Sequence, residues 1–181
     1  MGYMFTNMAA LENLNINNFN TSAVTNMNNM FSGMTSLRSL NLSNFDTANV
    51  KDMGGMFHNM KTITELNLSN FNTSNVLGME AMFYNMTALK TLDISNFDTS
   101  QVGSVKSIFA TADGDNLERI YVNNDFNTAR LTSYMDYTNM FTGRTKLRGG
   151  NGSYLSNPAT ADLTWLRVDR PGVQGYFTRK S

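Results

Sequence analysis

Phenylalanine recurs at one fixed interval, 26, along most of the chain. A fixed period of this length is typical of a solenoid, in which each repeat is one coil that cannot bury its apolar face alone. The pattern therefore predicts stacked coils and favours a binding surface over catalysis. We expect like rings to stack, with Phe71 packed between Phe45 and Phe97. One series comprises Phe5, Phe31, Phe57, Phe83 and Phe109, and a second comprises Phe19, Phe45, Phe71 and Phe97.

Each repeat contains two shorter periods. Apolar and polar residues alternate through Leu40–Ser43, which predicts a half-buried strand. From Val50 to Met60 apolar residues are three or four apart, which predicts a short helix. Residues 45–49 between them are rich in side chains that turn the chain or cap a helix. We therefore expect an α/β leucine-rich-repeat-type solenoid, a right-handed coil with one short strand and one short helix per repeat.

The regularity decays toward the C-terminus. Phe126 follows Phe97 at an interval of 29, and Phe141 follows Phe109 at an interval of 32. Terminal repeats of a solenoid are usually atypical because they cover an open core. We expect about five coils over residues 1–142, the fifth irregular, and a capping segment at 143–181.

The capping segment contains a predicted β-hairpin. Residues 164–168 alternate in polarity, residues 173–178 can return as a second strand, and Pro171-Gly172 between them fits a type II turn. We expect this hairpin to lay Trp165, Tyr176 and Phe177 over the last coil.

The repeat resembles that of BspA-like leucine-rich-repeat surface proteins of bacteria. The likeness rests on the unit Leu40–Thr47, followed by Val50, Met53, Met56, Phe57 and Met60. The ending, with its segments 149–152, 166–169 and 175–178, is similar to the one that closes such arrays in Gram-positive bacteria. Phe45 departs from the leucine-rich consensus, which has a buried Asn or Cys there. The resemblance implies a cell-surface or secreted protein, and several members are regarded as adhesins for host or matrix proteins.

Composition adds little to this picture. The chain has no cysteine, so disulfides and thiolate metal sites are excluded. It has no apolar run long enough to span a membrane, and its start lacks the features of a signal peptide. Because Met1 fits the repeat, we expect a piece of a longer array or a chain whose targeting segment has been removed. No cell-wall sorting motif is present.

Charge is balanced overall but unevenly spread. Residues 1–129 hold six Lys/Arg and eleven Asp/Glu, giving −5, and residues 130–181 hold eight and three, giving +5. Such asymmetry can indicate an anionic partner, but we favour a solvated surface on a distinct segment.

Three candidate chemistries have plainer explanations. The methionine pairs 27/30, 53/56 and 79/82 could bind Cu(I), but Val105 and Ile108 take the same positions, which favours core packing. His58 is the only histidine and has no partner at ligand spacing. Asp113 and Asp115 could bind calcium, but the full calcium-loop pattern is missing, and we favour a solvated loop. We expect no catalytic residue, cofactor or metal, and hence no enzyme.

Asparagine and threonine also recur in register. Coils stack about 4.8 Å apart, so like side chains can hydrogen-bond along the stack. A regular threonine array could instead bind ice, although this chain offers one threonine per coil where two are wanted. The columns are Asn18, Asn44, Asn70, Asn96 and Asn124, and Thr21, Thr47, Thr73, Thr99 and Thr128.

The outward strand positions are the best candidate binding surface. They are small and polar in the first four coils, whereas the fifth has an arginine and a tyrosine, residues enriched at binding hot spots. A solvated face is the alternative. The candidate partner-binding residues are Glu65, Asn67, Asp93, Arg119 and Tyr121.

We therefore expect a monomeric, non-catalytic surface module that binds a host or extracellular-matrix protein or a glycan. We expect no nucleic-acid partner and no membrane insertion. The alternative is a structural spacer that holds another domain away from the cell surface.

Overall fold

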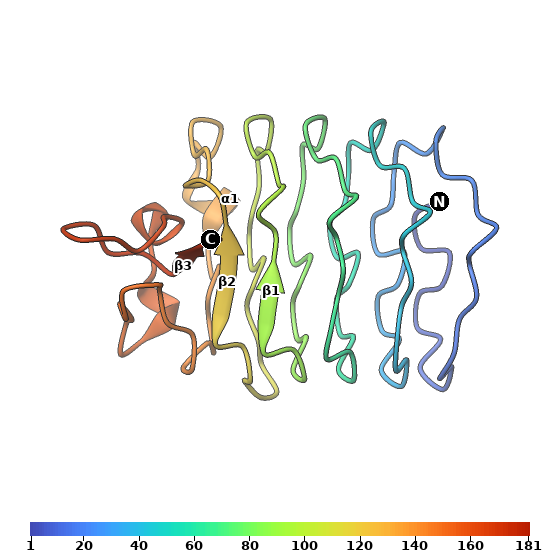
Figure 1. Ribbon diagram of the computed structural model, residues 1–181, viewed down its shortest axis with the longest axis horizontal. Helices are drawn as coiled ribbons and strands as arrows, with labels where there is room; N and C mark the ends of the chain where they lie inside the picture. The colour runs from blue at the N-terminus through green and yellow to red at the C-terminus, as the bar shows by residue number, and fades with distance from the viewer.

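The chain winds back on itself once per repeat, and equivalent residues of successive coils lie side by side. The computed structural model describes residues 1–181 and shows the coils in a row along one long axis (Figure 1). Backbone N–H groups donate to carbonyls one coil further on, as Met27 does to Asp52 and Met53 does to Gly78. Coils 1 to 5 are here residues 1–25, 26–51, 52–77, 78–103 and 104–135.

The segment predicted as a short helix is a run of turns instead. In coil 3 the N–H groups of Met53, Gly55, Phe57 and Asn59 donate to carbonyls of coil 4. Those of Met56 and His58 donate three residues back, and that of Gly54 donates to Asp52 Oδ1. Gly55 and Asn59 have φ angles of 61° and 59°, which lie outside the helical region. The helix prediction was wrong because a spacing of three or four also describes two tight turns in succession. The one α-helix, α1, is a four-residue element at Tyr134–Tyr137, capped by Ser133.

Three short strands form one parallel sheet of order β1-β2-β3. They are β1 (Thr91–Asp93), β2 (Arg119–Val122) and β3 (Phe177–Arg179). Asp93 pairs with Tyr121, and Tyr121 in turn pairs with Thr178.

The predicted strand of each coil forms only in coils 4 and 5. In coils 2 and 3 the expected alternation holds, with Leu42 and Leu68 buried and Asn41 and Asn67 exposed. These segments are extended but lack the ladder of backbone hydrogen bonds that defines a strand.

The core is one continuous cluster of 41 buried residues. Its axis is a column of stacked phenylalanine rings, with centroids 5.4–6.1 Å apart. The ring of Phe71 leans against Phe57 of this column, at 6.4 Å. Phe71 was expected to pack between Phe45 and Phe97, but its ring contact is with Phe57. The column comprises Phe5, Phe31, Phe57, Phe83, Phe109 and Phe141.

The asparagine and threonine columns bond to backbone and not to one another. Asn70 Nδ2 donates to the carbonyls of Leu42 and Phe45 in the preceding coil, at 3.0 and 2.8 Å. Thr47 Oγ1 donates to the carbonyl of Asn72 in the next coil and accepts from its N–H. Thr21, Thr47, Thr73 and Thr99 are at most 6% exposed and Thr128 is half-buried, so the column does not present a surface to ice.

The C-terminal segment covers the last coil without forming the predicted hairpin. It contains the 3-10 helices η1 (Pro158–Thr160) and η2 (Leu163–Trp165) and ends in β3. Residues 164–168, the expected first strand of the hairpin, begin within η2, which the Asp162 side chain caps. The expected second strand ends in β3, which pairs in parallel with β2 and not with the first segment. The turn at Pro171-Gly172 does form, and Gly172 has the positive φ, 78°, that a type II turn requires.

Aromatic side chains of this segment close the core. The ring of Tyr176 lies 4.7 Å from those of both Phe141 and Trp165, and Phe177 contacts Phe109 and Phe141 edge-on. None of the helices has the length and apolar composition needed to cross a bilayer.

Candidate binding surface on the strand face

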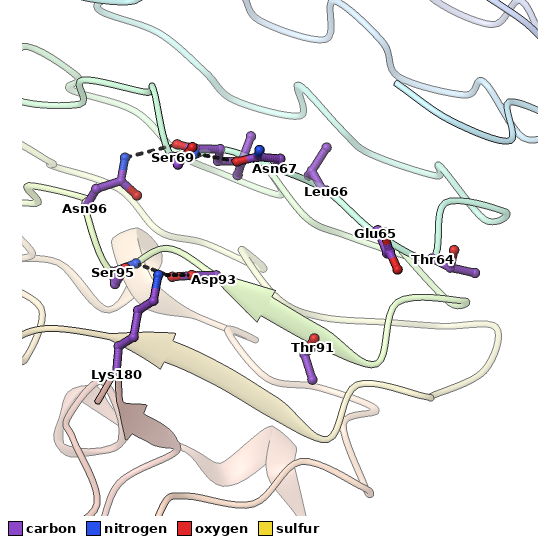
Figure 2. Close-up of a pocket in the computed structure, with 11 residues that line it drawn as sticks. Thr64, Glu65, Leu66, Asn67, Ser69, Thr91, Asp93, Ser95, Asn96 and Lys180 are labelled. Atoms are coloured by element: carbon purple, nitrogen blue, oxygen red, sulfur yellow. Dashed lines mark hydrogen bonds and ion pairs between the residues drawn. The ribbon is translucent and has the colours of Figure 1, made fainter. Parts of the chain in front are cut away.

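The outward residues of the strand segments 39–43, 65–69, 91–95 and 119–123 form one surface, here called the strand face. This face is hollowed between coils 3 and 4. Glu65, Asn67 and Asp93, three of the five candidate residues, line this hollow of about 470 Å³ together with Lys180 from the C-terminus (Figure 2). A second hollow, of about 120 Å³, lies between coils 2 and 3 and shares Asn67. The other residues lining the larger hollow are Thr64, Leu66, Leu68, Ser69, Thr91, Ser95 and Asn96.

Asp93 is the most constrained group in the hollow. Its carboxylate accepts from the N–H of Ser95 at 3.0 Å and pairs with the ammonium group of Lys180. Partial burial acts to raise the pKa of Asp93, but the hydrogen bonds from Lys180 and Ser95 outweigh it and lower the pKa below 3.8. Asp93 is therefore an ionised carboxylate whose charge is largely balanced.

The coil 3 side of the hollow is less constrained. Glu65 is exposed and takes part in no ion pair. Asn67 Oδ1 accepts from the N–H of Ser69 at 3.0 Å, which orients the amide and leaves Nδ2 available as a donor. The hollow thus carries one free carboxylate, one free amide donor and several hydroxyl groups.

The other two candidates lie beside the hollow and do not line it. Arg119 and Tyr121 are both half-buried on β2, and alternation with the buried Ile120 and Val122 puts them on the outer side. Arg119 Nη1 donates to the carbonyls of Glu118 and Arg148, so its guanidinium faces away from Asp93. Tyr121 is the strand neighbour of Asp93 and extends the polar surface by one coil.

Sequence reasoning missed Lys180. It occupies this surface because β3 pairs with β2 and the Lys180 N–H donates to the carbonyl of Val122. The pattern of the last residues gives no signal for this register.

The single histidine lies in the turn segment on the other side of the coil. His58 Nδ1 is 3.3 Å from Ser32 Oγ, and its ring stacks on Tyr84 at 4.9 Å. Burial lowers the pKa of His58 from 6.5. No carboxylate orients the imidazole, and neither His58 nor Ser32 lines the hollows described above.

Asp113 and Asp115 are held by different cations. Asp113 pairs with Lys61, and Asp115 pairs with Arg144 at 3.2 Å. Arg144 is 1% exposed, and burial lowers its pKa while Asp115 acts to raise it. No three His, Asp or Glu side chains gather in a cluster that could hold a metal ion. The two carboxylates therefore balance protein cations and do not face a common site.

The methionines that could have bound Cu(I) lie in the core. Met53, Met56, Met79 and Met82 are fully buried, and Val105 and Ile108 continue their columns in coil 5. Their role is to fill space between the aromatic columns and the turn segments.

A model of the family described as "Mycoplasma protein of unknown function, DUF285" matches residues 1–120 and 59–158. Together these matches span most of the chain, which therefore belongs to this family. Comparisons with curated proteins and with solved structures give no significant match.

Proposed function

We propose that this chain is a non-catalytic binding or adhesion module of a bacterial cell surface. Its strand face would contact a host or matrix protein or a glycan. On this proposal the chain is a right-handed, leucine-rich-repeat-type solenoid of the BspA-like kind. The resemblance of the repeat Leu40–Met60 to that family supports the surface location.

The observation that carries the binding role is the hollow between coils 3 and 4. It gathers Glu65, Asn67 and Asp93 on one face, next to Tyr121. Concave sites with convergent polar groups are the usual places where proteins bind ligands. Tyr121 is half-buried on the outer side of β2, and a partly exposed tyrosine supplies a large contact area at low entropic cost, as at binding hot spots.

A binding screen of the intact chain tests this proposal. The chain would be immobilised and exposed to matrix proteins, mucins and a glycan array, with heat-unfolded chain as the control. Saturable binding that depends on the folded state supports the module. The absence of any binding in all three classes contradicts it.

The second candidate is a structural spacer, and one feature specifically favours it. The same side-chain-to-backbone bonds join coil after coil, as Thr21, Thr47 and Thr73 each bond the backbone of the next coil. Such a continuous array of hydrogen bonds resists extension of the stack. A spacer of this kind does not require any particular outward-facing side chain. A spacer would therefore tolerate simultaneous alanine substitution of Glu65, Asn67 and Tyr121 in any assay of its biological role.

A further inference from the structure

We propose that the hollow between coils 3 and 4 binds one uncharged sugar unit of a glycan. This inference rests on the proposed function and names the ligand class that the strand face selects. The unpaired backbone groups, the closed ends and the charge of the hollow support it.

The backbone on both sides of the hollow has unused hydrogen-bonding groups. On either side of β1, Lys90 and Ile94 bond to coil 5, and the N–H and C=O groups of Thr91 and Asp93 are directed toward coil 3 by alternation. The N–H groups of Leu66 and Leu68, on the opposite side, have no acceptor in the protein. Donors and acceptors therefore alternate along both walls. A hydroxyl group, which donates and accepts, matches such walls better than a group that does only one.

The ends of the hollow limit the size of what can enter. At one end Asn96 Nδ2 donates to the carbonyls of Leu68 and Phe71, at 3.0 and 2.7 Å. On the far side of the strand segments, Thr87 Oγ1 donates to the carbonyl of Lys61 at 3.3 Å. These bonds hold coils 3 and 4 together beyond both ends of the strand segments. An added peptide strand would need the coils to separate by roughly 4.8 Å, so we exclude strand insertion.

The volume and lining suit a small hydroxylated molecule. About 470 Å³ falls within the range of roughly 300–1,000 Å³ typical of small-molecule sites. Only two of the 11 lining residues are hydrophobic, so an apolar ligand would leave many polar groups unsatisfied. Tyr121, one strand away, offers an aromatic surface at the rim for the next unit of a chain.

The charge of the hollow selects against acidic sugars. Glu65 and Asp93 contribute two negative charges and Lys180 one positive charge, which leaves a net −1. A sialic acid or sulfate would meet an unpaired carboxylate, and like charges at short range repel. An uncharged sugar can instead donate neighbouring hydroxyl groups to the two oxygens of Glu65.

A glycan array followed by titration calorimetry tests the inference with the intact chain. The probes are neutral oligosaccharides of hexose and N-acetylhexosamine units, each compared with its sialylated or sulfated form. We expect binding of at least one neutral probe with a Kd near or below about 1 mM and weaker binding of its acidic form. No neutral binder in this range, or a preference for the acidic forms, overturns the inference.

Matched variants locate the site. Glu65→Ala and Asn67→Ala should each weaken binding by roughly tenfold or more, which is about 1.4 kcal/mol. Asn15→Ala is the control, because Asn15 occupies in coil 1 the position of Asn67 but lies outside the hollow. Glu65→Gln should narrow the difference between neutral and acidic probes. An equal loss in Asn15→Ala, or no loss in the hollow variants, contradicts the assignment.

The same data separate this inference from the broader proposal. Binding to a matrix protein without binding to any neutral glycan contradicts the sugar site but supports the proposed surface-binding module. The absence of binding to every protein and glycan tested contradicts both the sugar site and the binding module, and it favours the spacer.

Discussion

Lys180, the penultimate residue, forms an ion pair with Asp93, which lies 87 positions earlier in the chain. The pair spans β2, because Asp93 belongs to β1 and Lys180 follows β3 directly. The C-terminal segment therefore does two things. It closes the apolar end of the stack through Tyr176 and Phe177, and it completes one wall of the hollow on the strand face.

Removal of residues 143–181 should destabilise the chain and cause it to aggregate. The truncation exposes the rings of Phe109 and Phe141 and removes the strand partner of β2. Terminal caps are what keep repeat arrays soluble. Light scattering and thermal melting of residues 1–142 check this expectation. A monomeric product with an unchanged Tm would show that the segment is an appendage and not a cap.

Phe57→Ala should lower the free energy of unfolding by about 3–5 kcal/mol, as truncation of a buried phenylalanine does. Phe57 is 0% exposed and contacts the rings of Phe31, Phe71 and Phe83. Urea denaturation measures the effect. Leu77→Ala is the control, because Leu77 is 48% exposed and its loss should change stability by no more than about 0.5 kcal/mol. Equal effects at the two positions would contradict the aromatic column.

Asp115→Asn should cost about 3–5 kcal/mol, since it leaves Arg144 buried without a counter-charge. Arg144 occupies the position that Met34, Met60 and Met86 hold in coils 2 to 4. The double variant Arg144→Met/Asp115→Asn should therefore recover most of the loss. The exposed pair Glu12–Arg38 is the control, and Glu12→Gln should change stability by about 1 kcal/mol or less. A double variant as unstable as Asp115→Asn would contradict this account.

Stability should fall as the pH drops below about 6.5, because of His58. Its pKa in the folded chain is lowered by burial from the 6.5 of an exposed imidazole, so the unfolded chain binds the proton first. The loss begins near pH 6.5 and is complete below the folded-state pKa. His58→Gln should remove this slope in urea denaturation measured from pH 8 to 5. A slope that persists in the variant would assign the effect to other groups.

A second acid-dependent loss should occur below about pH 4 and is distinct from that of His58. The pKa values of Asp98 and Asp125 are lowered, mainly by the backbone hydrogen bond from Ser100 and the side-chain hydrogen bond from Arg170, respectively. Carboxylates with lowered pKa values stabilise the fold above their unfolded pKa, and this contribution disappears as the pH falls through the folded-state value. This decline should be the same in the wild-type chain and in His58→Gln.

The apolar spacing correctly predicted which side chains are buried in the core, but it predicted the backbone conformation of each coil less well. The interval of 26 identifies the rings that stack, such as Phe31 on Phe57, because burial recurs once per coil. It does not distinguish a helix from two turns, because both place an apolar residue inside every three or four positions. Gly55 and Asn59 take left-handed conformations, which a helix does not contain.

The candidate surface was predictable only in part, for a similar reason. Alternation places Glu65, Asn67 and Asp93 outward, and the structure brings these three together in one hollow. Lys180 and the guanidinium of Arg119 depend on where the C-terminal segment lies, which no periodicity encodes. The pairing of Arg144 with Asp115 was missed because the apolar spacing gives no signal for an arginine that is buried where the other coils have a methionine.

The most direct test of the binding role compares Tyr121→Ala with Lys51→Ala against the partner identified by the screen. Tyr121 lies on the strand face beside the hollow, whereas Lys51 is exposed near the turn segments. We expect Tyr121→Ala to weaken binding by about 1–2 kcal/mol, roughly a tenfold rise in Kd, and Lys51→Ala to leave the Kd unchanged. Equal effects of the two substitutions, or a loss confined to Lys51→Ala, would contradict the assignment of binding to the strand face.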